Sequence, residues 1–230
     1  MPIIHDEEFG KITIRRSARA TQVRVRVAPD GTLRASLPLY APTFLVKRLL
    51  KTSRDELRDI IAQAAPIAEY TDGMRIGKSH SLIVRQSRSS ASASRHGQQI
   101  IVELPDGMSL NDAPIARMVR DAVIASLRVE AKSYLPKRLS YLAAKHGLQY
   151  EKVRFSHASG RWGSCSSTGT ISLNIALMKL PFELIDYVII HELAHTKHLN
   201  HSEEFWSLVS VGDPQYRQHR RALKHETPSI

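Results

Sequence analysis

The residues best suited to chemistry in this 230-residue chain are three histidines and a glutamate between positions 191 and 201. His191 and His195 are four residues apart, so on a helix their imidazoles project from one face and can bind one metal ion. Glu192 follows His191, where its carboxylate can reach a water molecule held by that metal. His201 supplies a third neutral ligand and leaves the fourth tetrahedral position of zinc open. The H-E-x-x-H spacing therefore predicts a zinc site that activates water for hydrolysis, as in zinc metallopeptidases.

The surrounding sequence predicts the helices that must position these side chains. Apolar residues recur at helical spacing from Phe182 to Leu193, and Pro181 suits a first helical turn. Six further residues would advance a straight helix by about 600°, which turns the third histidine away from the other two. We therefore expect Asn200 to end the helix in a left-handed conformation. Ser202 should cap a second helix, which docks through Phe205, Trp206 and Val209.

Two other residues near the motif have side chains that can bind metal. His198 is expected to support a ligand or to lie at the surface, because three ligands already suffice. Cys165 is the single cysteine, and a lone cysteine near a strand is more often part of the core than a ligand. The predicted metal ligands are therefore His191, His195 and His201.

The candidates for substrate binding are Arg161, Ser172 and Asn174. In zincin metallopeptidases an edge strand beside the cleft holds an extended peptide by backbone pairing, and we expect the strand over 170–174 to be that strand. Arg161 can bind a substrate carboxylate or phosphate or steady an oxyanion, and it can equally anchor its own loop together with Trp162. Tyr187 and Tyr216 are further candidates for assisting the reaction, and the sequence does not choose between them.

Several blocks of the chain resemble the YgjP-like family of zinc metallopeptidases, which is related to the SprT/Spartan and WLM peptidase groups. The specific blocks are Arg161-Trp162-Gly163-Ser164-Cys165-Ser166, Ile171-Ser172-Leu173-Asn174, Ile185-Asp186-Tyr187-Val188, His191-Glu192-Leu193-Ala194-His195, Asn200-His201-Ser202 and Phe205-Trp206. The opening segment, with Arg16-Ser17-Ala18-Arg19 and Val23–Val27, is similar to that family as well. The resemblance implies a zincin-type core, with a small mixed sheet, an active-site helix and a zinc water assisted by Glu192. It also implies that the three histidines are the ligands.

The pattern of elements predicts an α+β fold in two parts, with a boundary near residue 108. Residues 1–108 should form a β-rich module with one helix over about 43–64, and residues 109–230 a zincin-like metallopeptidase domain. Strands are expected at Lys11–Arg16, Gln22–Val27, Leu33–Leu37, Ser81–Arg85, Gln99–Leu104, Val153–Ser156 and Thr170–Asn174.

The connections between these elements carry their own signals. Pro29-Asp30-Gly31 predicts a hairpin turn, and the Ser/Ala/Arg-rich segment 87–97 predicts a flexible loop. A helix over about 112–146 should kink or split at Pro136 and end at Gly147.

Composition indicates a cytoplasmic enzyme. Hydrophobic residues make up 42% of the chain, and no apolar run approaches the roughly 20 residues of a membrane span. The first residues are acidic instead of following a signal-peptide pattern, and a single cysteine excludes an internal disulfide.

The formal net charge is +11, from 33 Lys and Arg against 22 Asp and Glu. The basic residues concentrate in two places: Arg15, Arg16, Arg19, Arg24 and Arg26 in the first strands, and Arg217, Arg220, Arg221 and Lys224 near the C-terminus. This balance favours weak, non-specific contact with nucleic acid, and a solvated basic surface explains it equally well. Aromatic content is only 6%, without a motif that reads bases.

These observations predict a zinc-dependent metallopeptidase in which Glu192 accepts a proton from water and passes it to the leaving nitrogen. The alternatives are a zinc hydrolase of a non-peptide substrate such as a nucleotide phosphoanhydride, a nucleic-acid-associated protease, and a binding module with a structural zinc. Glu192 argues against the last alternative, because a structural site has no use for a carboxylate that is not a ligand. Oligomeric state and physiological substrate are open at this stage.

Overall fold

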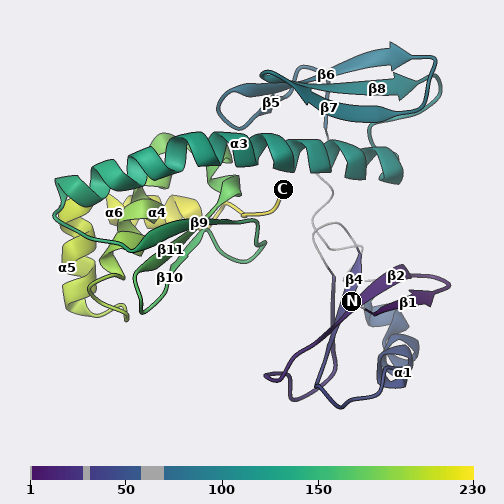
Figure 1. The fold of residues 1–230 in the computed structure, drawn as a ribbon, viewed down its shortest axis with the longest axis horizontal. Helices are drawn as coiled ribbons and strands as arrows, with labels where there is room; N and C mark the ends of the chain where they lie inside the picture. Colours follow the sequence, from purple (N-terminus) through teal and green to yellow (C-terminus); the bar gives the residue numbers. More distant parts are fainter. Residues whose placement is uncertain (1, 28–31, 58–69) are drawn as a thin grey trace. The chain divides into compact units, whose positions relative to one another are not determined.

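The N-terminal part of the chain forms a four-stranded sheet covered on one face by a helix (Figure 1). The computed structural model describes residues 2–27, 32–57 and 70–230. The strands of this sheet run in the order β1-β2-β4-β3. They are β1 (Ile3–Asp6), β2 (Gly10–Arg16), β3 (Arg24–Val27) and β4 (Leu33–Leu37). Strands β2 and β4 are parallel, and the outer pairs are antiparallel.

Strand alternation gives this sheet one apolar and one basic face. The apolar face packs on α1 (Phe44–Thr52) and forms a core of Ile12, Ile14, Leu33, Ala35, Leu37, Val46, Leu50 and Leu57. The opposite face carries Arg15, Arg24, Arg26 and Arg34, which we call the arginine face. Arg24 and Arg26 are both exposed, as their alternation with Val25 and Val27 predicts. Strands β2, β3 and β4 contain no Asp or Glu.

Helix α1 ends at Thr52 and residues 54–57 are again helical, while the rest of the expected helix over 43–64 lies outside the described residues. The expected turn at Pro29-Asp30-Gly31 also lies outside them. Strand β1 was missed by the sequence analysis, and it pairs with β2 in antiparallel register.

The second sheet is built from β5 (Arg75–Ile76), β6 (His80–Ser87), β7 (Ser92–His96) and β8 (Gln99–Pro105), in the order β5-β6-β8-β7. The expectation of a flexible loop over 87–97 was wrong, because β7 pairs with β8 from Ser92↔Glu103 to His96↔Gln99. Its polar composition reflects a position at the sheet edge, where most of its side chains are exposed. Gly97 closes the hairpin with a positive φ of 59°.

Helix α3 (Ala113–Lys145) lies between this second sheet and the elements that carry the histidines (Figure 1). It runs unbroken through Pro136, so the expected split does not occur. Buried residues on either side of the proline, Leu135 and Leu139, hold the helix against its neighbours. Gly147 follows the helix with a φ of 63° and ends it, as predicted.

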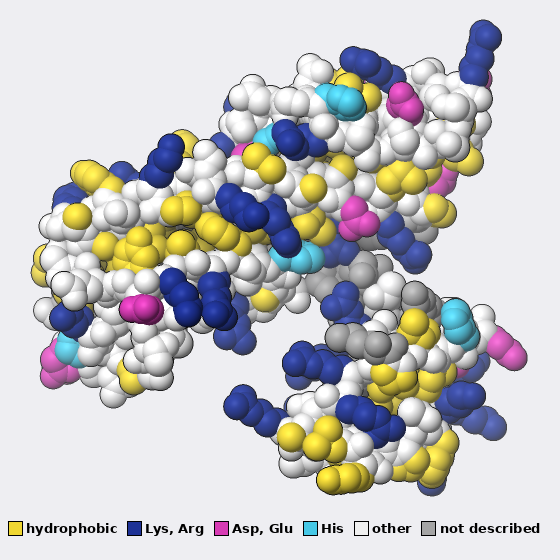
Figure 2. All heavy atoms as spheres, viewed as in Figure 1, with side chains coloured by type: hydrophobic (Ala, Val, Ile, Leu, Met, Phe, Trp, Pro, Cys, Tyr) yellow, Lys and Arg dark blue, Asp and Glu magenta, His cyan; other side chains and the backbone are white. Residues whose placement is uncertain are grey.

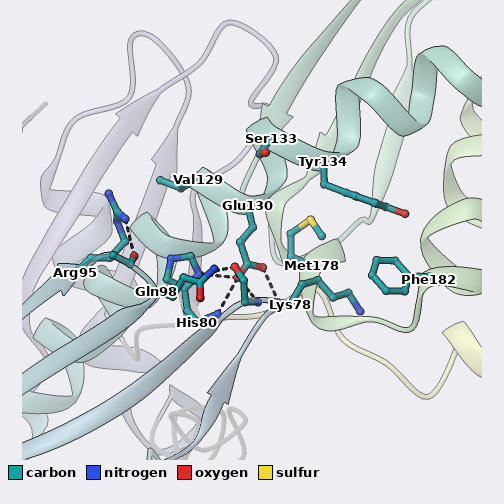
Figure 3. A pocket seen from close by; sticks show the side chains of 12 residues that line it. Lys78, His80, Arg95, Gln98, Val129, Glu130, Ser133, Tyr134, Met178 and Phe182 are labelled. Carbon is teal, nitrogen blue, oxygen red and sulfur yellow. Dashed lines mark hydrogen bonds and ion pairs between the residues drawn. The ribbon is translucent and has the colours of Figure 1, made fainter.

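Glu130 of α3 anchors the turn between β5 and β6 (Figure 3). Its carboxylate accepts hydrogen bonds from the backbone N–H groups of Lys78, Ser79 and His80, and from His80 Nδ1 at 2.6 Å. Lys78 in turn donates to the carbonyl of Leu180 and lies over the ring of Phe182, 4.4 Å from its centroid. These contacts connect the second sheet through α3 to the start of the next helix.

The third sheet has the order β10-β11-β9 and precedes a series of short helices. Its strands are β9 (Lys152–Ser156), β10 (Gly163–Cys165) and β11 (Thr170–Asn174). The helices are η1 (Ile175–Lys179), α4 (Phe182–Ala194), α5 (Glu203–Gly212) and α6 (Tyr216–Leu223). The expectation that β11 is an edge strand was wrong: β11 is the central strand, bonded to β10 on one side and β9 on the other.

The chain forms two compact units, residues 1–69 and 70–230. A boundary near residue 108, which the sequence pattern predicts, would separate β5–β8 from α3, on which they pack. The expected α+β fold class is confirmed. Among the described residues, none of the helices combines the length and the apolar composition that a membrane crossing requires.

Candidate metal centre

His191, His195 and His201 come together in the structure and form what we call the histidine cluster. One potential ligand atom from each lies within 4.8 Å of the others. The Nε2 atoms of His191 and His201 are 3.2 Å apart. His191 lies in the last turn of α4 and His195 is the C-cap residue of that helix, so the two are one turn apart as their spacing predicts, and His201 reaches them from the segment before α5.

The chain reverses after α4 through a tightened last turn. The N–H groups of Lys197 and His198 both donate to the carbonyl of Ala194, and that of Thr196 donates to Leu193. Asn200 does not adopt the expected left-handed conformation, since every described residue with a positive φ is a glycine. Ser202 is the N-cap residue of α5, as predicted.

His198 serves the site through its backbone. Its carbonyl accepts a hydrogen bond from Nδ1 of His195 at 3.0 Å, which requires that nitrogen to carry the proton. The other ring nitrogen, Nε2 of His195, is thereby left as the unprotonated atom that can bind a metal. The side chain of His198 is not part of the histidine cluster.

The histidine cluster lies on an apolar support. Phe205 of α5 is fully buried, and its ring centroid is 5.0, 4.5 and 4.7 Å from the rings of His191, His195 and His201. Burial, together with the smaller effects of the charges on His195, His201 and Arg220, lowers the pKa of His191 to about 3. At neutral pH His191 is therefore an unprotonated imidazole, which is the form that binds metal.

The residues present fit a zinc ion. Two neutral Nε2 atoms 3.2 Å apart repel each other unless a proton or a cation lies between them. Two atoms of the site, His191 Nδ1 and Glu192 Oε2, are buried without a hydrogen-bond partner among the described residues. Such atoms are rare in folded proteins and mark places where an ion or water belongs. Three imidazoles with a carboxylate that is not a ligand are the donor set of a catalytic zinc site.

Glu192 is held against β10 at a position that only glycine allows. The residue is 6% exposed, and a Cβ atom on Gly163 would lie 2.6 Å from its Oε1. Burial raises the pKa of Glu192 to about 8, and the nearby charge of Arg161 partly offsets that effect. The carboxylate borders a cavity of about 200 Å³, whose wall also includes His191, Tyr187 and Leu223. A carboxylate with high proton affinity therefore lies at a cavity that also reaches a predicted metal ligand.

The predicted substrate-binding residues have different environments. Asn174 is fully buried, its Nδ2 donates to the carbonyls of Ala158 and Arg161, and its Oδ1 accepts from Ala176. These bonds occupy its amide, so it holds the loop and caps η1 instead of facing a substrate. Ser172 lies on the central strand opposite Ser164 of β10. Arg161 is exposed, and its charge acts on Glu192.

Two features of the site were missed by the sequence analysis. Gly163 leaves the space that the side chain of Glu192 occupies. The one indication of this role in the sequence is that Gly163 lies inside the Trp162-Gly163-Ser164 block. Leu223 of α6 lines the cavity beside Glu192, and no local pattern indicates that this distant helix folds back onto α4. Cys165 is half-buried on β10 outside the histidine cluster, and burial raises its pKa.

An H-E-x-x-H helix beside a small mixed sheet, with a third histidine returning to the same point, defines a metallopeptidase. The family model described as the YgjP-like metallopeptidase domain matches residues 21–226. The chain belongs to the YgjP-like metallopeptidase family, as its sequence blocks predict. Its functional class is therefore that of a hydrolase.

Among solved structures, one that is similar to the chain is that of a metallopeptidase. The crystal structure of the metallopeptidase zymogen of Pyrococcus abyssi abylysin is 29% identical in sequence. The match covers 39% of this chain and 92% of that one, with a TM-score of 0.36. No curated protein matches the chain.

Proposed function

We propose that this protein is a zinc-dependent peptidase that uses Glu192 as its general base. The observation that carries the proposal is the convergence of three histidine ligand atoms within 4.8 Å beside Glu192, whose buried Oε2 has no hydrogen-bond partner among the described residues. In this proposal His191, His195 and His201 hold the zinc ion and the fold has a zincin-like core. Zinc, when bound, supplies a Lewis acid that makes water acidic and polarises a carbonyl.

Glu192 moves the protons of the reaction. Its Oε2 takes a proton from the water whose oxygen attacks the carbonyl carbon. The same carboxyl group then gives that proton to the amide nitrogen as the carbon–nitrogen bond breaks. Burial raises the pKa of Glu192 to about 8 against the opposing charge of Arg161, so its carboxyl group can hold the proton that it must pass on. The positive charge of a bound zinc ion would favour the base form that accepts this proton.

An extended substrate can pair with β10. This strand is at the edge of the third sheet, so its outer backbone groups face away from β11. Gly163 of β10 contacts Glu192, which puts the strand next to the general base. A peptide that adds to this edge would therefore bring its carbonyl groups past Glu192. Arg161, at the end of the loop before β10, is the candidate for holding a substrate carboxylate.

The proposal is tested by metal analysis and hydrolysis together. We expect about one zinc per chain and cleavage of a fluorogenic peptide panel that stops with chelator and returns with zinc. Glu192→Gln should keep the zinc and the fold and lower turnover by about 10²–10⁴-fold. Hydrolysis of nucleoside triphosphates without any peptide cleavage would contradict the peptidase and favour the phosphoanhydride alternative. Zinc without either activity would favour a structural site.

The arginine face supports a second candidate, a peptidase associated with nucleic acid. Arg26 of β3 lies directly opposite Arg34 of β4, and both side chains are exposed. A polyanion that lies across this face would contact several guanidinium groups through its phosphates. On the face of the molecule shown in Figure 2, Lys and Arg side chains also outnumber Asp and Glu. Binding of this kind would not depend on sequence, since phosphate contacts carry no base information.

A further inference from the structure

A basic recess of about 540 Å³ lies beside the histidine cluster, and the mechanism above does not use it. It is lined by two aromatic residues and four cations: Trp206, Tyr216, Arg217, Arg220, Arg221 and Lys224. We call it the basic recess. All of its lining residues belong to α5, α6 and the residue that follows α6.

The basic recess begins one ring away from a predicted metal ligand. The ring of His201 stacks on Trp206, with centroids 5.5 Å apart and planes at 24°. Trp206 stacks in turn on Tyr216, again at 5.5 Å, and the guanidinium of Arg220 lies 4.7 Å from the Trp206 centroid. An extended chain advances about 3.3 Å per residue, so the recess lies about two or three residues along a peptide from the metal.

The four cations occupy one face of α6. Arg217, Arg220, Arg221 and Lys224 recur at intervals of three and four residues, an arrangement in which like charges destabilise a helix. None of them forms an ion pair with an Asp or Glu in the described parts of the chain. They also lie near the predicted metal site, where a bound cation would repel their positive charges. An anion in the basic recess would remove both penalties.

The opposite face of α6 is fastened to the active-site helix. Nδ1 of His219 is bonded to Asp213 at 2.7 Å, and its ring lies 6.4 Å from that of Tyr187 on α4. Leu223 borders the cavity that contains Glu192. Helix α6 is thus held in place through His219 and Leu223, while its cations line the recess. This arrangement gives a rigid support for recognising a charged group.

We propose that the basic recess binds an acidic side chain of the peptide substrate, so that the enzyme selects peptides with Asp or Glu about two or three residues from the scissile bond. This inference rests on the peptidase function proposed above. Guanidinium groups bind carboxylates through paired hydrogen bonds, and the aromatic walls of Trp206 and Tyr216 can pack on the methylene groups of the same side chain. A carboxylate of the peptide substrate explains the recess better than a separate polyanion does. The recess adjoins the predicted metal centre, and the substrate is the molecule that has to bind there.

The first experiment measures binding without turnover. Zinc-loaded Glu192→Gln protein, which should turn over at least about 100-fold more slowly than wild type, is titrated against fluorescein-labelled hexaglutamate and hexaglutamine peptides, with anisotropy as the readout. We expect hexaglutamate to bind at least about tenfold more tightly, with an affinity that falls as salt rises. The double variant Arg217→Glu/Arg221→Glu should lose this preference. The matched control in the same background is Arg128→Glu/Lys132→Glu, which makes the same change of charge at two exposed residues of α3 and should keep the preference.

The second experiment measures cleavage. Matched peptides that differ only by Glu or Gln near the scissile bond are compared by kcat/KM, after cleavage sites in a peptide mixture have been mapped by mass spectrometry. We expect the wild type to prefer the Glu peptide through a lower KM, and the Arg217→Glu/Arg221→Glu variant to prefer a Lys peptide instead. Thermal unfolding checks that both double variants are folded.

The outcomes separate the two proposals. Peptide cleavage without a preference for acidic residues would overturn the inference and leave the peptidase function standing. Charge-dependent hexaglutamate binding without cleavage of any peptide would support the basic recess as a site for acidic peptides and overturn the peptidase function. Stronger competition by a nucleoside triphosphate or by duplex DNA than by hexaglutamate, lost in the Arg217→Glu/Arg221→Glu variant, would overturn the inference in favour of a phosphate ligand.

Discussion

Replacing Gly163 with alanine should move Glu192, the proposed general base, without touching a predicted metal ligand. The new Cβ would lie 2.6 Å from Oε1 and 2.7 Å from Cγ of Glu192. Ordinary contact begins at 3.4 Å, so the carboxylate must retreat by about 0.8 Å. A displacement of about 1 Å in a catalytic group can lower a rate by about 10²-fold, so we expect kcat/KM to fall by about 10- to 100-fold. The effect should be smaller than that of Glu192→Gln.

The assay is steady-state cleavage of the best fluorogenic peptide, with zinc content and thermal unfolding measured on the same samples. Zinc content should be unchanged, and the free energy of unfolding should fall by about 1–3 kcal/mol, as is usual for an added methyl group in a packed site. Gly160→Ala is the matched control, because a Cβ there meets no atom within 4 Å and the residue has no positive φ. It should keep the wild-type rate.

A wild-type kcat/KM for Gly163→Ala would refute the reasoning, because it would mean that the position of Glu192 against β10 does not matter for catalysis. A loss of zinc together with activity would also contradict it. In that case the methyl group would have disturbed the histidine cluster rather than the base.

Three further predictions concern other parts of the molecule. His201→Ala should weaken zinc binding by more than about 100-fold, since even the outer partners of metal ligands are worth about 10–100-fold, while His198→Ala should bind zinc normally in a chelator competition. Glu130→Gln should lower the free energy of unfolding at pH 7 by about 1–3 kcal/mol in urea denaturation. Burial alone would raise the pKa of Glu130, but hydrogen bonds from the 78–80 turn hold it below its ordinary value of 4.5. Wild-type stability should therefore fall as the pH drops below that value, and the stability of Glu130→Gln should fall less. Duplex DNA should bind the wild type weakly, and the logarithm of the binding constant should fall with the logarithm of the salt concentration with a slope near −0.9 per phosphate neutralised. Arg24→Glu/Arg26→Glu should abolish that binding. Binding that survives the change would exclude the arginine face as the DNA-binding surface.

Local sequence patterns predicted the structure correctly where a feature depends on a single helix or strand. The four-residue spacing of His191 and His195 predicts one helix face, and the structure puts them one turn apart at the end of α4. Alternation predicts that Arg24 and Arg26 are exposed on one side of β3. Gly147 and Ser202 end and begin helices where predicted. These features depend on backbone periodicity and capping, which neighbouring residues decide among themselves.

Local sequence patterns gave wrong predictions where contacts between distant segments determine the secondary structure or the strand order. Ser87–Gly97 is polar and reads as a loop, yet Ser92–His96 becomes β7 because the edge of β8 accepts it. Pro136 breaks an isolated helix, but buried leucines on both sides carry α3 through it. The strand over 170–174 was correctly located, although its central place in the sheet, which closes it to substrate, depends on how β9 and β10 pair with it.

The chemistry of the site was therefore determined by the sequence, and its environment by the tertiary structure. Residue types and spacing were enough to name Glu192 and its three histidines. The raised pKa of Glu192, the fit of its side chain against Gly163, and the basic recess one ring from His201 exist only because β10, α5 and α6 fold back onto α4. Burial and the proximity of charges depend on three-dimensional packing. Residues about 20 or 30 positions apart in the sequence acquire them only when the chain has folded.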